Sequence, residues 1–345
     1  MKKLFIAFAA AAAFTPPAAA ETLSVVGSWS GLPLHKQYEK PFWEETLPKA
    51  AGGKLTVTMT THDQMGMGVG DVYRLLGRGV YDVAMTVADY AVADAPELEG
   101  LDVPLIALTA DKERAAVEAA RPMVADIYKT RFNSHVLAIV PYPPQVVFCN
   151  KKIASLRDLK GLKIRASGRM TAKFLDALGA EGVNVAFSEV TGALQKGVVD
   201  CAVTGAGSGY SAGWWEVSTH LLTLPLGGWD PVVVAINADK WKRLDPAVQR
   251  LLATEIKTTF EDAVWAAAEG ALRNDAACLT GSGHCASGPS RSMVLVQATD
   301  ADMAEARTIL ETKVLPDWAS RAGKEWAERW NNTVGTVVGV SIPTN

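Results

Sequence analysis

One arginine in the 345-residue chain stands where a charge is unusual. Arg165 lies between Ile164 and Ala166 in a short alternating run, Leu162–Ala166, which is typical of a strand, and Gly168 follows just beyond it. A planar guanidinium presents parallel N–H donors that match the two oxygens of a carboxylate. A solvated surface charge is the alternative, but Arg165 is far from any basic run. Its position at a strand end favours a fork of donors that points into a cleft.

Residue patterns that would support catalysis are sparse. The flanks of Ser208 and Ser282 do not fit a G-x-S-x-G motif, and the five histidines are scattered, with no two at a metal-ligand spacing. The glycines of Gly66–Gly70 precede a predicted helix but lack the Gly-Lys-Ser/Thr of a phosphate-binding loop. With 34 basic and 37 acidic residues, the chain has no basic stripe for nucleic acid, and no cofactor is expected. A secreted or periplasmic enzyme acting on a small organic acid stays open, since catalytic residues also assemble from distant segments.

The residues around Arg165 alternate short strands with helices. Between Ile153 and Gly209 the apolar periods predict the order βαβαβ, which implies a parallel sheet. Ligands approach such a sheet at the carboxyl ends of its strands, and Arg165 and Thr204 stand at two of these ends. The predicted strands are 162–166, 183–187 and 198–203, and the predicted helices are 171–178 and 189–196.

Several motifs recur here in a fixed order. DLKGLKIR, ALGA, FSEV and ALQKGVVD follow one another within residues 153–209, and GVYDVAM, PELEGLDVPL and INADKWKRLDPAVQRLL occupy 79–85, 96–105 and 236–252. Together they resemble the substrate-binding proteins of TRAP transporters, the DctP-type family of tripartite, ion-driven uptake systems. The resemblance covers nearly the whole mature chain. It implies a periplasmic solute-binding protein that captures an organic acid by its carboxylate and hands it to a membrane permease.

The strand–helix alternation and the resemblance imply a two-lobed periplasmic binding protein fold of the α/β class, with mixed sheets flanked by helices. Tyr142–Pro144 is expected to be the first hinge crossover, because two consecutive prolines cannot sit inside a central strand. Leu224–Asn237, with two glycines, is the expected return crossover. The first lobe is expected over residues 21–142 plus 231–269, and the second over 143–230 plus 270–345.

Two long helical segments are predicted in the last third of the chain. From Pro246 to Leu279 apolar side chains recur at helical spacing, which gives a helix on the order of 50 Å long at 1.5 Å per residue. The resemblance implies that this helix spans both lobes, and two helices broken near Gly270 are the alternative. Asp302–Trp330 is predicted to be helical with a break at Pro316, and its tryptophans are predicted to pack in the core.

The first 20 residues have the pattern of a secretory signal. Lys2 and Lys3 precede an apolar run, Leu4–Phe14, and small residues at Ala18 and Ala20 form an A-x-A cleavage site. The apolar run is shorter than the ~20 residues of a membrane span. We therefore expect cleavage after Ala20 and a periplasmic protein that is not embedded in the membrane.

The four cysteines are expected to meet an oxidising compartment. Cys278 and Cys285 enclose a short loop with two glycines, which suits a disulfide, although a zinc site using His284 is the alternative. Cys149 and Cys201 lie in predicted core strands of the second lobe. They pair if those strands are neighbours, and otherwise they are two buried free thiols.

The resemblance also assigns pocket residues. Arg165 matches the arginine that makes the two-pronged bond to the ligand carboxylate, and Phe187 and Thr204 match pocket positions. Thr204 replaces the Asn of the acid-sugar binders, and Gln145 stands where those proteins have a second arginine. Both departures speak against a sialic-acid type of ligand.

A second group of candidates surrounds the return crossover. Trp229 and Asp230 fall where the 2-oxoacid and lactate binders have Trp-Glu near a bound cation, so Asp230 is either a metal ligand or a hinge-side acceptor. The companion acid of that branch is absent, which leaves the metal pattern incomplete. A bulky or aromatic monocarboxylate is favoured over a small dicarboxylate, because the TGAGSG run of residues 204–209 leaves space beside the acid group. The remaining candidates are Trp29, Trp214 and Arg169.

Overall fold

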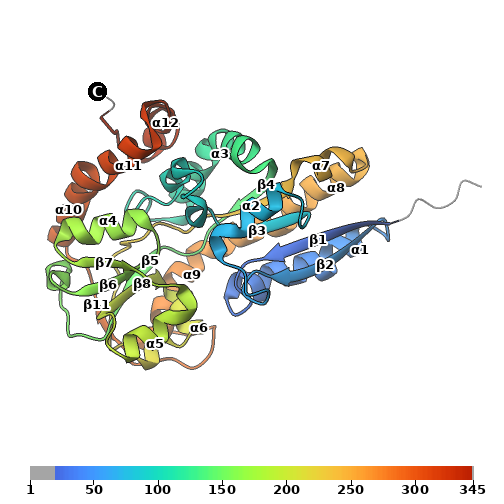
Figure 1. The fold of residues 1–345 in the computed structure, drawn as a ribbon. Coiled ribbons are helices and arrows are strands. Elements are labelled where there is room, and N and C mark those ends of the chain that lie inside the picture. Colours follow the sequence, from blue (N-terminus) through green and yellow to red (C-terminus); the bar gives the residue numbers. More distant parts are fainter. Residues whose placement is uncertain (1–19, 344–345) are drawn as a thin grey trace, which may run out of the picture.

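The computed structural model describes residues 20–343, and it contains two mixed β-sheets with helices on both faces of each (Figure 1). The predicted signal peptide falls on residues 1–19, outside the described residues. None of the described helices is long and apolar enough to cross a membrane.

The first sheet has five strands in the order β2-β1-β3-β10-β4. β1, β2 and β3 are parallel, and β10 runs antiparallel to both of its neighbours. The strand bounds are β1 Glu21–Gly27, β2 Leu55–Thr61, β3 Val83–Val87, β4 Ser134–Val140 and β10 Val232–Asn237.

The second sheet has six strands in the order β11-β9-β5-β8-β6-β7. β6 is parallel to β7 and β8, as the βαβαβ pattern predicts, while β5 is antiparallel to β8 and β9. Phe187 was expected to end a strand, but β7 stops at Asn184 and Phe187 opens a 3₁₀ turn. The bounds are β5 Gln145–Cys149, β6 Lys163–Ala166, β7 Glu181–Asn184, β8 Cys201–Gly205, β9 His220–Leu222 and β11 Val294–Val296.

The chain passes between the sheets at both predicted crossovers. Residues 141–144, the sequence Pro-Tyr-Pro-Pro, connect β4 to β5, and residues 223–231 connect β9 to β10. In each sheet the strand that follows a crossover, β5 or β10, is the antiparallel one. The two segments therefore lie side by side where the sheets meet, and Gly227 donates its N–H to the carbonyl of Gln145 at 3.4 Å.

Helices fill the space around the sheets. Helix α3 covers one face of the first sheet and contacts β4. The bounds are α1 Leu47–Ala50, α2 Val72–Gly77, α3 Ala110–Phe132, α4 Arg169–Leu178, α5 Val190–Gln195, α6 Ala206–Ser211, α7 Ala238–Arg243, α8 Pro246–Glu255, α9 Asp262–Thr280, α10 Asp300–Ile309, α11 Leu315–Ala322, α12 Lys324–Trp330 and α13 Thr336–Val338.

The long helix predicted after Pro246 is continuous. α8 and α9 are joined by a π-helical segment, Ile256–Glu261, and the helix ends at Gly281, whose φ of 69° is left-handed. It does not break at Gly270. The π segment contacts β4 of the first sheet, and α9 contacts α6 beside the second sheet, so the helix spans both (Figure 1).

The break predicted at Pro316 is wrong. The helix continues from α10 through a π-helical segment, Leu310–Val314, into α11. The wider π-turn gives room for the proline ring, which in a regular α-helix would contact the carbonyl of residue i−4. The chain breaks instead at Gly323, where φ is 94°.

Two of the three C-terminal tryptophans, Trp318 and Trp330, pack in the core as predicted, whereas Trp326 is only half-buried. Trp318 and Trp330 are fully buried, and their ring N–H groups donate to the carbonyl oxygens of Pro96 at 3.0 Å and Gly100 at 2.8 Å. A Cβ on Gly100 would lie 2.5 Å from the Trp318 ring, so only glycine fits there. The C-terminal helices thus hold the 3₁₀ segment Pro96–Leu101 in place.

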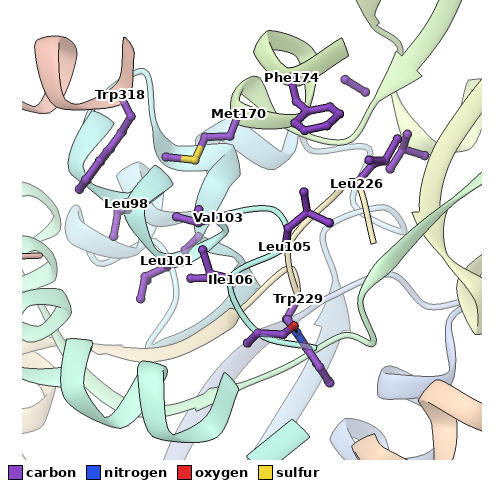
Figure 2. Packing of buried hydrophobic residues seen from close by; sticks show 14 of the residues in the cluster. Leu98, Leu101, Val103, Leu105, Ile106, Met170, Phe174, Leu226, Trp229 and Trp318 are labelled. Carbon is purple, nitrogen blue, oxygen red and sulfur yellow. Dashed lines mark hydrogen bonds between the residues drawn. The ribbon is translucent and has the colours of Figure 1, made fainter. Parts of the chain in front are cut away.

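One hydrophobic cluster runs from the first sheet to the second. It includes Val26 of β1 and Val147 of β5, and it continues through residues 98–106 and the second crossover. Figure 2 shows part of this cluster, with Met170 and Phe174 of α4 near residues 98–106 and Leu226. Two further clusters fill the remaining face of each sheet.

Both cysteine pairs form disulfides. Cys149 and Cys201 lie directly opposite each other on β5 and β8, with Cα atoms 4.1 Å apart, which decides the alternative that the sequence left open. Cys278, in the last turn of α9, is bonded to Cys285 as predicted.

Candidate ligand-binding site

Arg165 lies at the end of β6 and is 2% exposed. Its Nε–H donates to the carbonyl of Val185 at 3.0 Å, and Nη1 donates to the carbonyl of Val203 at 2.6 Å. These two bonds fix the guanidinium plane from both neighbouring strand ends. Within residues 20–343 no carboxylate lies within 4.0 Å of it, so a buried positive charge is left without an ion-pair partner.

Arg165 faces a small cavity between the two sheets. The first sheet contributes residues at or beyond the ends of β1 and β3, and the second contributes residues at or beyond the ends of β6, β7 and β8. The crossovers contribute Tyr142 and Asp230. This is the arrangement expected for ligands that bind at the carboxyl ends of parallel strands. The lining residues are Trp29, Leu32, Val87, Tyr90, Tyr142, Arg165, Ser167, Phe187, Thr204, Ser208 and Asp230.

Aromatic rings form much of the cavity wall. The ring of Trp29 lies 5.6 Å from that of Tyr90, 6.4 Å from that of Tyr142 and 6.2 Å from that of Phe187, measured between centroids. Trp29 and Phe187 follow strands of different sheets, so the aromatic contact joins the two sides of the cavity. A flat apolar group fits such a wall, while Arg165 supplies the charge.

A buried carboxylate stands at the second crossover. Asp230 lines the cavity, and its backbone N–H donates to Oδ1 of Asp102 at 2.8 Å. Burial, and then the charge of Asp89, raise the pKa of Asp230 to about 7, against the opposing effect of Arg165. Burial and then the charge of Asp230 raise the pKa of Asp102 well above its ordinary value. A Cβ on Gly228 would overlap Oδ1 of Asp102, so glycine at that position lets the two acids approach.

A second carboxylate joins the two sides of the site. Asp89 follows β3 of the first sheet, and its carboxylate occupies the space where Gly168, the N-cap of α4, would carry a Cβ. The first turn of a helix has free N–H groups and a partial positive charge, which favour an anion. Burial nevertheless raises the pKa of Asp89 well above its ordinary value, with Asp102 adding to the effect.

A family model for bacterial extracellular solute-binding proteins, family 7, called DctP, matches residues 30–283. The chain belongs to this family. Proteins of the family are periplasmic receptors that bind solutes, and the enzyme alternative is set aside.

Curated relatives of this solute-binding protein match part of the chain. A solute-binding protein of Albidiferax ferrireducens is 27% identical over 148 residues, and a protein of Sinorhizobium fredii without an assigned function is 28% identical over 163 residues. The matches cover 42% and 45% of this chain, and they span 43% and 29% of those two proteins.

Solved structures with the same fold come from the same class of receptor. An extracytoplasmic solute receptor of Bordetella pertussis that binds pyroglutamic acid has a TM-score of 0.77 at 19% identity, covering 91% of this chain and 99% of its own. A TRAP periplasmic solute-binding protein of Desulfovibrio salexigens with bound orotic acid has a TM-score of 0.79 at 17% identity, covering 92% and 99%. A marine metagenome TRAP protein with bound 3-hydroxybenzoate has a TM-score of 0.78 at 22% identity, covering 93% and 98%.

Five of the predicted site residues meet at the cavity of this solute-binding protein. Their separation along the chain reaches 201 positions, from Trp29 to Asp230, so only the fold brings them together. They are Arg165, Phe187, Thr204, Trp29 and Asp230.

The other four predicted residues lie outside the cavity. Trp214 is fully buried behind it, with its ring centroid 5.9 Å from Cζ of Arg165 and 5.3 Å from the Phe187 ring. Trp229 packs in the core and donates its ring N–H to the carbonyl of Ala107 at 2.9 Å (Figure 2). Gln145 is fully buried against Gly227, and Arg169 is exposed at the start of α4.

Sequence reasoning missed several wall residues. Tyr90 follows β3, and Ser167 lies two residues beyond Arg165, so both occupy the strand-end positions that the predicted parallel sheet already marked. Tyr142 was assigned to the crossover but not to the pocket, and Ser208 was seen only as part of a small-residue run. A rule that every polar or aromatic residue just after a strand faces the cleft would have found the first two.

A metal at Asp230 lacks partners in the described chain. Within residues 20–343 no three His, Cys, Asp or Glu side chains converge in a way that could hold a metal ion. Asp102 is the carboxylate next to Asp230, and its Oδ1 already accepts a backbone hydrogen bond. This geometry favours Asp230 as a hydrogen-bond acceptor over Asp230 as a metal ligand.

A second, larger cavity adjoins the first. It has about 610 Å³ of space beside α9, shares Tyr142 and Ser208 with the cavity at Arg165, and is lined mostly by apolar side chains. Asp275 is the acid in its wall, and burial raises the pKa of that carboxyl to about 6.

Proposed function

We propose that this protein is the periplasmic receptor of a TRAP uptake system, which captures an organic acid by its carboxylate and delivers it to the membrane permease subunits. The observation that carries the proposal is Arg165. It is buried, it is fixed by two backbone carbonyls, and no carboxylate of the described chain lies within 4.0 Å of it at the cavity. A ligand carboxylate would supply the missing partner through a two-pronged, charge-assisted hydrogen bond.

The cavity favours a monocarboxylate with a flat apolar part. Arg165 is the cation in the cavity wall, because Arg169 points away from it at the protein surface. Four aromatic side chains line the remaining space, namely Trp29, Tyr90, Tyr142 and Phe187. These rings favour a flat apolar group beside the carboxylate.

Capture is proposed to involve closure of two lobes, residues 21–142 plus 231–269 and residues 143–230 plus 270–345. Contacts from both halves, such as the one between Trp29 and Phe187, favour a closed state around the ligand. Export is proposed to follow a signal peptide cleaved after Ala20, which places the receptor where the ligand arrives.

A thermal-shift screen of organic acids tests this function. A ligand that binds only the folded protein raises its melting temperature by mass action. The wild type should respond to aromatic or cyclic monocarboxylates, and Arg165→Lys should lose most of the response, because the charge survives while the planar fork does not. Undiminished affinity in Arg165→Lys would place the carboxylate elsewhere.

The exposed Arg169 offers a matched control. Arg169→Lys makes the same chemical change four residues away, outside the cavity, and should leave the response within twofold of the wild type. A screen in which no carboxylate shifts the melting temperature would refute the proposed function.

A further inference from the structure

We infer that the ligand carries a hydrogen-bond donor beside its carboxylate, and that Asp230 accepts this hydrogen bond and so selects the ligand. The inference rests on the proposed function, in which Arg165 holds the carboxylate. It adds a second polar contact on the other side of the same cavity.

The cavity holds two opposite charges that do not pair with each other. Arg165 and Asp230 both line it, yet within residues 20–343 neither forms an ion pair shorter than 4.0 Å. A ligand with only a carboxylate would satisfy Arg165 and would offer no donor to the half-buried Asp230 carboxylate in the cavity wall. Burying such a group unpaired is costly, so a ligand N–H or O–H at that position is favoured.

The backbone of Asp230 is held in a conformation that few residues adopt. Its φ is 42°, in the left-handed region, and its N–H is fixed by Oδ1 of Asp102 at 2.8 Å. The preceding Trp229 is anchored to the carbonyl of Ala107 at 2.9 Å. Strained backbone of this kind persists where the surroundings hold it, and it is common at ligand sites.

The groups around Asp230 leave its carboxylate available as an acceptor. Asp102 and Asp89 are the neighbouring acids, and burial raises the pKa of each well above its ordinary value, which favours their neutral forms. Arg165 is the cation that favours the charged form of Asp230. Gln145 lies on the adjacent strand, and its amide atoms have no hydrogen-bond partner among the described residues. Of these three acids, Asp230 is the one that lines the cavity, so it is the acid that a ligand would contact.

The same arrangement rejects small dicarboxylates. A second carboxylate placed opposite the one on Arg165 would meet the like charge of Asp230 in a water-poor cavity. Like charges at that range disfavour binding strongly, because the screening by water is lost.

Matched pairs of acids test the inference by titration calorimetry on the full mature protein. Each pair differs by one donor: pyroglutamate against 5-oxotetrahydrofuran-2-carboxylate, mandelate against phenylacetate, and 3-hydroxybenzoate against benzoate. The wild type should bind the donor-bearing member of a pair at least about tenfold more tightly, since a site built for a donor leaves its acceptor unpaired without one.

The Asp230→Asn variant should lower that ratio, because its neutral amide oxygen is a weaker acceptor than a carboxylate, and should gain weak binding of succinate. Asparagine tolerates a left-handed backbone, so the variant keeps the local fold, which its unliganded melting temperature checks. Asp275→Asn removes a buried acid from the neighbouring cavity and should leave the ratio unchanged.

Two outcomes contradict the inference while sparing the proposed function. The first is that both members of each pair bind the wild type equally well. The second is that Asp230→Asn leaves the ratio unchanged. Either result would show that Asp230 does not accept a hydrogen bond from the ligand. If none of the acids binds, the proposed function fails, and this inference falls with it.

Discussion

Arg165 donates to the backbone at two of its five N–H groups, which leaves three for a ligand. Because the carbonyls of Val185 and Val203 belong to the chain just beyond β7 and within β8, the side chain is oriented before any ligand arrives. Preorganisation of this kind reduces the entropy lost on binding. It also explains why lysine, with one rotatable ammonium group, is a poor replacement.

The buried acids near the site predict a pH dependence of stability. Burial raises the pKa of Asp102 in the folded state, so the folded protein binds that proton more tightly than the unfolded chain does. This contribution to stability is present below the unfolded pKa of about 4 and is lost as the pH rises. Asp102→Asn removes the dependence, so its melting temperature relative to wild type should be at least about 2 °C higher at pH 8 than at pH 5.

Asp63 provides a control, because its expected pH dependence of stability has the opposite sign. Although burial acts to raise its pKa, hydrogen bonds from Ser30 help to lower it overall. The stability from a lowered pKa is present above the unfolded value and lost in acid. Asp63→Asn should therefore cost melting temperature at pH 8 and less at pH 3. A pH-independent difference for Asp102→Asn would contradict the assignment of a raised pKa to that acid.

At the scale of single elements, the start of α4 joins the two sides of the site. Asp89 approaches so closely that a Cβ on Gly168 would overlap its Oδ2. We predict that Gly168→Ala weakens ligand binding at least about tenfold, because the closed arrangement needs the space that the methyl group takes. Small-angle scattering with saturating ligand should show a larger radius for the variant than for the wild type.

A glycine in the next helix separates this effect from helix propensity. Gly192 lies in α5, and a Cβ built on it meets no atom within 4 Å. Gly192→Ala should be neutral for binding and slightly stabilising, by about 0.5–1 kcal/mol. If Gly168→Ala and Gly192→Ala bind the ligand with equal affinity, the close approach of Asp89 to Gly168 is not needed for binding.

Strand and helix patterns in the sequence predicted most elements, but they did not predict every element boundary or every residue that lines the cavity. Alternation marked β6 and placed Arg165 at its end, where the structure has it. Pro316 was misjudged because a π-turn, which no short-range pattern reveals, accommodates the ring. Trp214 and Trp229 were misjudged because an aromatic residue near a site looks the same in sequence whether it lines a cavity or packs behind it. Tyr90 could be placed in the cavity wall only with knowledge of the order of the strands in the first sheet.

For the whole molecule, two disulfides predict a simple chemical signature. Cys149–Cys201 and Cys278–Cys285 use all four cysteines, so the exported protein should take up no alkylating reagent before reduction and four equivalents after it. Intact mass in denaturant measures both numbers. Two labels without reduction would mean that one pair is open, and peptide mapping identifies which pair.

Loss of the Cys149–Cys201 bond should weaken the sheet that carries Arg165. The bond joins β5 to β8, and β8 is the neighbour of β6. Replacing both cysteines by serine is expected to cost about 2–5 kcal/mol of unfolding free energy. Denaturant titration measures the loss, and a cost below about 1 kcal/mol would contradict it.

The hydrophobic cluster that continues from β1 to β5 has a consequence for heat denaturation. Neither sheet closes its core alone, because residues 98–106, the second crossover and the C-terminal helices contribute to both sides. A calorimeter should therefore record one endotherm, with equal van't Hoff and calorimetric enthalpies, instead of the two peaks of independently melting halves. A ligand held at Arg165 would then move that one transition as a unit, and the stabilisation would reach segments as remote from the cavity as Trp330.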